Sequence, residues 1–182
     1  MDLQELLHEY NRGERNFSNI CLHKADLRGA CLSGVDFSGV DLTEADLSGA
    51  DLSRANLCNA NLADADLTAI DLSGAKLRSV NLIGSDLSRA SLVGADLTDA
   101  DLRTAELEQA DLRGAVLCNV AISGANLTYA NLNSAYIEET DLNSAELRGA
   151  KLDLIKHHPP TQPSAGSSRW ISWGSHLSLI HI

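Results

Sequence analysis

A five-residue period runs without a break through most of this chain of 182 residues. A bulky apolar residue recurs at every fifth position from Phe17 to Leu152, which gives 28 repeats; 24 of these residues are Leu, two are Phe and two are Ile. Two positions earlier, 19 of the 28 residues are Ala, and the residue in between is Asp or Asn in 18 repeats. We call these the central, the inner and the outward position, and the two residues after the central one the first and second corner positions.

Neither a continuous helix nor a continuous strand can use this period. A helix turns by about 100° per residue, so leucines five residues apart would spiral around it and form no stripe. In a strand the leucines would alternate between the two faces, because five is an odd number. The pattern suits a short extended segment followed by a corner, with the central and inner residues pointing inward together. Stacking such corners along an axis predicts a β-solenoid whose neighbouring coils lie about 4.8 Å apart.

Composition argues against an enzyme with a conventional pocket. Aromatic residues are only 4% of the chain and there is a single Met, so large side chains to line a deep apolar cavity are scarce. His23 is the one histidine within the repeats, and no Ser–His–Asp arrangement is indicated. We therefore predict no enzymatic activity, no catalytic residues and no cofactor.

The cysteines and the net charge indicate which cellular compartment and which kinds of partner suit the chain. Cys21, Cys31, Cys58 and Cys118 form no CxxC pair and no zinc-ligand spacing, so we predict no metal site and reduced thiols in the cytoplasm. No segment has the length of a membrane span. The net charge of −11 disfavours direct binding to nucleic acid or to an anionic membrane, and it suits a basic protein partner.

Many of the repeats carry a recognisable motif. Runs such as Ala45-Asp46-Leu47-Ser48-Gly49, Ala55-Asn56-Leu57-Cys58-Asn59 and Ala95-Asp96-Leu97-Thr98-Asp99 resemble the A(D/N)LXX motif of pentapeptide-repeat proteins. The resemblance covers about three-quarters of the chain, which resembles cyanobacterial members with an N-terminal capping helix. It implies an all-β fold, a right-handed quadrilateral β-helix with four repeats per coil and therefore about seven coils.

Three parts are expected along the chain. Residues 1–14 form a helical cap, because Asp2 and Glu5 resemble a capping box and Gly13 would end the helix. Residues 15–154 form the β-helix. Residues 155–182 form an irregular tail, because the repeat stops after Leu154 and Pro159 and Pro160 interrupt any regular element. The last six residues of the tail resemble translated sequencing-adapter sequence, so the tail is either not native or an apolar segment that docks on the open last coil.

An acidic column is the candidate interaction site. Twenty residues per coil, a number taken from the resemblance, would stack Asp26, Asp46, Asp66, Asp86, Glu106 and Glu146 on one face, with Asn126 between the last two. Outward Asp and Asn residues are usual in the family, so such columns also arise without a function.

The resemblance implies a rod-shaped, non-enzymatic protein-interaction or scaffold module whose partner is an unknown protein. Two alternatives remain open: an acidic DNA mimic that binds DNA gyrase or a related topoisomerase, and a regulator of cell differentiation that acts through protein binding. Basic residues such as Arg54, Arg89 and Arg103 interrupt the acidic surface, which weighs against mimicry. An exposed C-terminal coil also leaves open an end-to-end homodimer.

Overall fold

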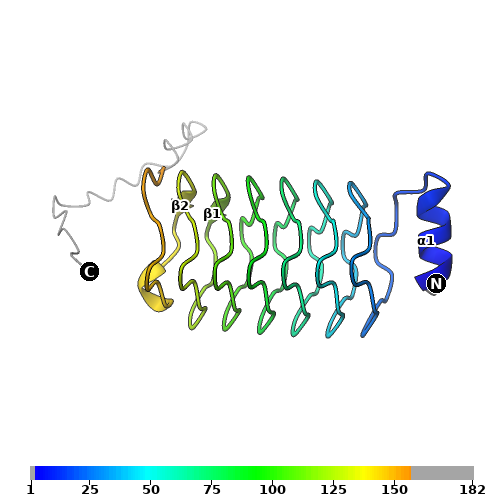
Figure 1. Ribbon diagram of the computed structural model, residues 1–182, viewed down its shortest axis with the longest axis horizontal. Coiled ribbons are helices and arrows are strands. Elements are labelled where there is room, and N and C mark those ends of the chain that lie inside the picture. The colour runs from blue at the N-terminus through cyan, green and yellow to red at the C-terminus, as the bar shows by residue number, and fades with distance from the viewer. Residues whose placement is uncertain (1–2, 157–182) are drawn as a thin grey trace, which may run out of the picture.

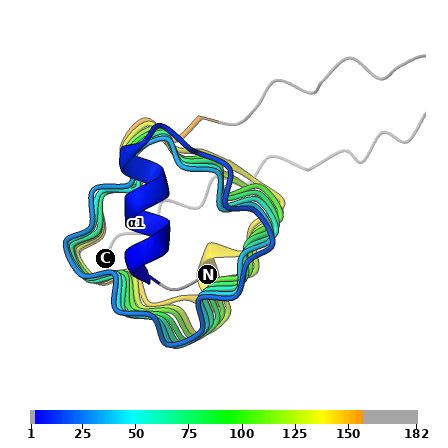
Figure 2. The same ribbon diagram turned by 90° about the vertical axis from the view of Figure 1, so that its right-hand side faces the viewer.

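A computed structural model describes residues 3–156, and this part of the chain forms a rod of stacked coils (Figure 1). Helix α1 (Leu3–Asn11) comes first, followed much later by strands β1 (Val116–Cys118) and β2 (Tyr136–Glu138) and the 3-10 helix η1 (Leu142–Ser144). The remainder consists of short extended segments that alternate with turns. Figure 2 looks along the rod, where successive coils superpose and α1 lies across one end.

Backbone pairing between coils has a constant register of twenty residues. Isolated parallel bridges join outward residues such as Asn16 and Asp36 at the start and Tyr136 and Lys156 at the end. Strands β1 and β2 continue the same pairing, with Val116 opposite Tyr136 and Leu117 opposite Ile137. One coil therefore takes four pentapeptides, and residues twenty apart lie above one another along the rod.

All but one of the repeats turn through a corner whose second corner residue has a positive φ. In the second repeat, the Ala25 amide donates to the Leu22 carbonyl over 3.0 Å, and Lys24 between them has a φ of 58°. A positive φ at the third residue is the geometry of a type II turn, which favours Gly and Asn. Asn or Gly occupies many of the second corner positions. Ser144, at one of these positions, does not have a positive φ, because η1 replaces the turn there.

The interior is filled as the period predicts. Central Leu, Phe and Ile residues are buried up to residue 137, and the inner Ala and Val residues are buried from Val35 to Ala135, whereas Ala25 and Ala30 of the first coil are half-buried. Bulky and small inward side chains therefore alternate along the chain. Phe17 and Phe37 pack edge to face, with ring centroids 6.2 Å apart. The inner hydroxyl of Ser85 is buried but donates to the Leu82 carbonyl over 2.8 Å, so it is satisfied locally.

Helix α1 closes the first coil. Its Leu6 is fully buried against the core, and the Tyr10 hydroxyl donates to the Ser33 carbonyl over 2.8 Å. The Arg15 guanidinium lies 3.9 Å from the centre of the Tyr10 ring. Gly13, with a φ of 103°, follows the helix, as expected from its sequence. Asp2 of the predicted capping box lies outside the described residues.

The last coil is less regular. Its central residues Leu142, Leu147 and Leu152 are only half-buried, and no bridge joins residues 121 and 141. Thr140, at an inner position, reaches back to the previous coil: its Oγ1 donates to the Leu117 carbonyl over 2.8 Å and accepts from the Val120 amide over 3.0 Å. The hydroxyl thus takes the place of the usual direct turn bond, and the 28 repeats are not all equivalent.

Candidate functional site

The outward positions on one side of the rod form the acidic column. Consecutive bridges join all seven of its residues in order: Asp26, Asp46, Asp66, Asp86, Glu106, Asn126 and Glu146. Every acidic residue of the predicted column is therefore brought onto one line, and the backbones of successive residues in it lie about 4.8 Å apart, the strand spacing. Carboxylates this close repel one another wherever no cation lies beside them.

The local turn fixes the direction of these carboxylates. Asp46 Oδ1 accepts from the Ser48 amide over 3.0 Å and from its hydroxyl over 2.7 Å. Asp66 accepts from the Thr68 amide over 2.9 Å, and Asp86 from the Ser88 amide over 2.8 Å. Asp and Asn are favoured at this position because a short side chain can accept from the amide two residues ahead.

A single arginine neutralises the N-terminal end of the column. Arg28 forms two short hydrogen bonds with Asp26, Nε to Oδ1 at 2.8 Å and Nη2 to Oδ2 at 2.6 Å. Its Nε also lies 3.6 Å from Oδ2 of Asp46 in the next coil. The side-chain hydrogen bond from Arg28, helped by its backbone amide, lowers the pKa of Asp26 to about 2.

The middle of the column has no such partner. Within residues 3–156, Asp66, Asp86 and Glu106 form no ion pair. Glu106 Oε2 accepts from the Asn126 amide group over 2.7 Å, which leaves its charge in place. We name Asp66, Asp86 and Glu106 the unpaired triad; it is the part of the column best able to attract a basic surface.

Elsewhere on the rod, arginine at the first corner position pairs with the aspartate two residues before it. Arg103 binds Asp101 and Arg113 binds Asp111, each with an Nη2–Oδ2 distance of 2.7 Å. The side-chain hydrogen bond from the arginine lowers the pKa of both aspartates, against a smaller effect of burial. The signal for these pairs was visible in the sequence as Asp-Leu-Arg, since residues two apart on a strand share a face.

The cysteines show no shared site. All four are free thiols, with Cys21 and Cys31 exposed and Cys58 and Cys118 half-buried. Cys21 Sγ lies 3.9 Å from Asp41 Oδ2, one coil further on. Among the residues that the structure describes, no group of three or more His, Cys, Asp or Glu side chains could hold a metal ion.

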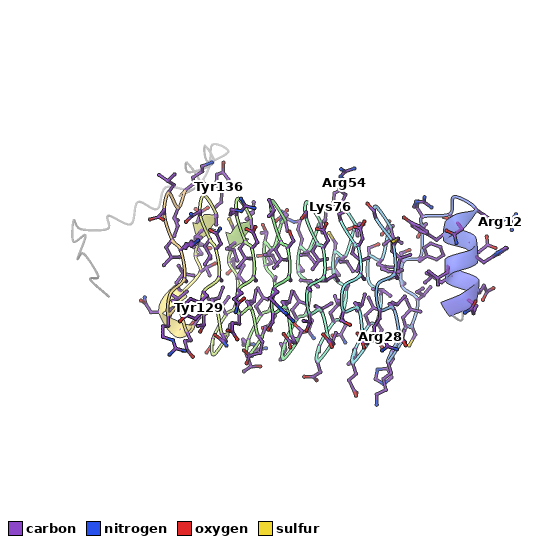
Figure 3. The ribbon with its side chains drawn as sticks, in the orientation of Figure 1. Arg12, Arg28, Arg54, Lys76, Tyr129 and Tyr136 are labelled. Carbon is purple, nitrogen blue, oxygen red and sulfur yellow. The ribbon has the colours of Figure 1, made fainter. Side chains whose placement is uncertain are left out.

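One outward surface was missed in the sequence. Val116 and Tyr136 occupy outward positions, where Asp or Asn is the rule, and they face each other across the β1–β2 pair. Figure 3 labels Tyr136 near the C-terminal end of the rod, on the same side as Lys76, which belongs to the same line of outward positions. The available signal was the change of residue type at two outward positions twenty residues apart.

Comparisons with known proteins agree with this architecture. The family model for Pentapeptide repeats matches in eight copies, including residues 20–59, 36–74, 70–109, 81–119, 95–133 and 122–154. No curated protein matches the sequence significantly. No helix among residues 3–156 is both long and apolar enough to cross a membrane.

Three of the solved structures similar to this chain come from two cyanobacteria and a plant. HetL, a pentapeptide repeat protein involved in heterocyst differentiation regulation in Nostoc sp. strain PCC 7120, is 31% identical over 86% of this chain and 94% of its own, with a TM-score of 0.42. A pentapeptide repeat protein from the Arabidopsis thaliana thylakoid lumen is 34% identical over 52% of this chain and 66% of its own, with a TM-score of 0.51. One from Cyanothece 51142 is 31% identical over 82% and 95%, with a TM-score of 0.28. The chain belongs to the pentapeptide-repeat family.

Proposed function

We propose that this chain is a non-enzymatic interaction module, a rigid rod that binds a protein partner through its outward and corner side chains. In this proposal the rod is a right-handed, four-sided β-helix of about seven coils, about 34 Å long at the strand spacing. Residues 1–14 act as the cap, residues 15–154 as the binding rod and residues 155–182 as a separate tail. The free thiols at all four cysteines are consistent with a reducing compartment such as the cytoplasm.

The observation that carries the proposal is the contrast between a uniform interior and a varied exterior. Buried positions repeat the same few apolar residues in coil after coil, while outward and corner positions hold Asp, Asn, Arg, Lys, Ser, Tyr and Val. Interior positions must fill the same space in every coil, so they cannot distinguish one partner from another. Specificity for a partner therefore has to come from the exterior.

The unpaired triad is the proposed electrostatic contact. Asp66 and Glu106 are exposed and Asp86 is half-buried, and the three side chains lie on consecutive coils. A row of Lys or Arg side chains on a partner would pair with them and relieve their mutual repulsion. Such pairing raises the association rate and gives specificity, and it weakens as salt is added.

A capture experiment with matched variants tests the proposal. The full chain is immobilised and proteins from a native lysate are quantified against the triple variant Asp66→Asn, Asp86→Asn and Glu106→Gln. A control variant, Asp51→Asn with Asp71→Asn, removes two carboxylates from another line of outward positions. We expect a small set of proteins to be enriched by the wild type and the control but lost with the triple variant. Enrichment of no protein above a scrambled-surface rod would refute the interaction function.

The charges on the rod surface also bear on the two alternative functions, DNA mimicry and regulation of cell differentiation. Arg28, Arg103 and Arg113 place guanidinium groups directly beside carboxylates, whereas duplex DNA carries one negative charge per about 1.7 Å along its axis without fixed cations. We therefore expect no inhibition of DNA gyrase supercoiling at micromolar rod, and inhibition would favour mimicry. A role in cell differentiation, suggested by the relative HetL, is a specific form of protein binding, and deletion of the gene in the native host would test it.

A further inference from the structure

The line of outward positions that contains β1 and β2 changes character toward the C-terminal end. Bridges place its residues in the order Asn16, Asp36, Asn56, Lys76, Asp96, Val116, Tyr136 and Lys156. Its N-terminal part is polar throughout, while Val116 and Tyr136 are adjacent apolar residues on successive coils. Outward Val and Tyr contribute nothing to the interior, so their presence here needs a reason other than the packing of the rod.

The local backbone presents these side chains on a regular pair of strands. Within the described residues, β1 and β2 are the two segments long enough to count as strands, and they pair in register. Val116 and Cys118 point outward on either side of the buried Leu117, and all three of Val116, Cys118 and Tyr136 are half-buried. The Thr140 hydroxyl replaces the direct turn bond between Leu117 and Val120. We name Val116, Cys118 and Tyr136 the β1–β2 patch.

Carboxylates surround the patch. Asp96 is bridged to Val116, and Glu138 is paired with Cys118, followed by the exposed Glu139. Asp99 lies at the corner beside them, where its Oδ1 accepts from the Asn119 side chain over 2.8 Å. The cationic residues near the patch in the preceding coils are Lys76, which is bridged to Asp96, and Arg78, whose Nη1 lies 3.2 Å from Asp96 Oδ2. Burial, and then the charges of Glu138 and Asp96, raise the pKa of the Cys118 thiol, which agrees with a negative potential at the patch.

The Tyr136 ring already lies beside a cation within the chain. The ammonium group of Lys156, one coil further on, lies 5.1 Å from the ring centre. A tyrosine face attracts Lys or Arg through its quadrupole, and the surrounding carboxylates add to this attraction. An aromatic residue at the centre of a polar rim is also the composition typical of the energetically dominant part of a protein interface.

We propose that the β1–β2 patch anchors the partner by binding a polypeptide segment in which an aliphatic or aromatic side chain is flanked by Lys or Arg. The apolar side chain contacts Val116 and Cys118, a flanking cation displaces Lys156 from the Tyr136 ring, and the remaining basic residues pair with Glu138, Glu139 and Asp99. This inference rests on the proposed interaction function and deepens it by naming the chemistry of the partner segment. It is independent of the unpaired triad, which lies on a different line of outward positions.

A peptide array tests the inference without knowledge of the natural partner. The labelled full chain is applied to random dodecapeptides, and selected peptides are measured in solution by fluorescence polarisation. The test variant is Val116→Asn with Tyr136→Asn. Asparagine already occupies outward positions of the rod at Asn56 and Asn126, so the substitutions suit the fold. The control is Cys31→Asn with Ser91→Asn, two uncharged outward positions on another line. Circular dichroism confirms that both variants fold.

We expect the selected peptides to share an apolar residue flanked by Lys or Arg, and the test variant to bind them at least about tenfold more weakly while the control binds normally. Peptides without this pattern, or equal binding by the test variant, would overturn the inference. If the triple variant of the triad loses lysate partners while the patch variant keeps them, the interaction function stands and the patch assignment fails.

Two other occupants are distinguished by the same variant. Both tryptophans, Trp170 and Trp173, lie outside the described residues, so their emission reports on the C-terminal segment alone. A red shift of this emission in the test variant would show that the chain's own tail covers the patch. Self-association of the wild type in sedimentation, abolished in the test variant, would show that a second copy does. Either result contradicts a basic partner segment as the occupant.

Discussion

The two ends of the rod bury the same kinds of residue to very different extents. At the N-terminal end, α1 covers the first coil, so Leu6 is fully buried and Phe17 and Leu22 beneath it are nearly so. At the C-terminal end, the central residues Leu147 and Leu152 are only half-buried. The central residues are alike at both ends. Among residues 3–156, α1 lies against the first coil, whereas no described element lies against the last, which accounts for the difference.

This contrast shows where the stability of such a chain resides. A coil gains its burial from the coils on either side, and no single coil offsets its own conformational entropy. Helix α1 supplies the missing neighbour at one end through Leu6 and Tyr10. We therefore expect unfolding of the described part to start at the last coil and to progress toward the cap.

The largest effect is expected from a cavity in the middle of the rod. Leu77 is fully buried, and Leu77→Ala should lower the free energy of unfolding by about 3 kcal/mol, because the neighbouring coils cannot collapse into the space. The matched change Leu152→Ala in the half-buried last coil should cost only about 1 kcal/mol. Urea unfolding followed by circular dichroism measures both, and equal losses would remove the distinction between the middle and the end.

Weakening the cap should make the two ends more alike. Leu6→Ala removes most of the apolar anchor of α1 and should cost about 2 kcal/mol, a value limited by the docking free energy of the helix, since α1 can detach while the coils remain folded. Hydrogen exchange should then accelerate at the amides of residues 17–24 and stay unchanged beyond the middle of the rod. The exposed change Gln4→Ala serves as the control, and acceleration along the whole rod would show that the coils cannot fray separately.

A smaller effect is expected from the polar contact of the cap. Tyr10→Phe keeps the ring under Arg15 and removes the hydroxyl that donates to the Ser33 carbonyl, which should cost about 1 kcal/mol. Arg15→Gln tests the stacked guanidinium separately. Thermal unfolding of the single and double variants in a cycle gives the coupling between the two contacts, and full additivity would mean that they act independently.

The smallest effect is expected on the stability of the chain at acidic pH. The folded-state pKa of Asp26 is about 2, below its usual value of 3.8, so the folded chain binds this proton only at lower pH than the unfolded chain does. The stability contributed by the Arg28 pair is therefore complete above about pH 4 and is lost as the pH falls toward 2. In Arg28→Gln the melting temperature should change less across this interval. The last ion pair among the described residues is Arg113–Asp111, so Arg148→Gln in the final coil should leave the acid profile unchanged.

Much of the coil geometry could be predicted from the period alone. Inward pairs such as Ala45 and Leu47, and the use of Asp46 to accept from the amide two residues ahead, follow from which side chains fit inside a corner and which do not. The alignment of Asp26 to Glu146 needed one further number, twenty residues per coil, which the family resemblance supplied and the bridges now show.

Other features depended on contacts between coils that the period does not encode. The Arg28 contact to Asp46 and the insertion of Thr140 between Leu117 and Val120 both join residues about twenty apart in sequence. The irregular last coil could not be foreseen either, because its central residues Leu147 and Leu152 match those of the buried coils. The repeat motif predicts which side chains of each coil point inward. How far those side chains are buried depends on the neighbouring coils or helix.

The constant register of twenty has a consequence for how such a surface can change. Gain or loss of one whole pentapeptide would leave every leucine inside, because the inward positions recur every five residues. It would also rotate all later outward residues by a quarter of a coil relative to the earlier ones, so that Asp66, for example, would no longer sit above Asp86 if the insertion fell between them. Duplication of a single pentapeptide would therefore change which outward residues lie side by side, and so the binding surface, while the core remained intact.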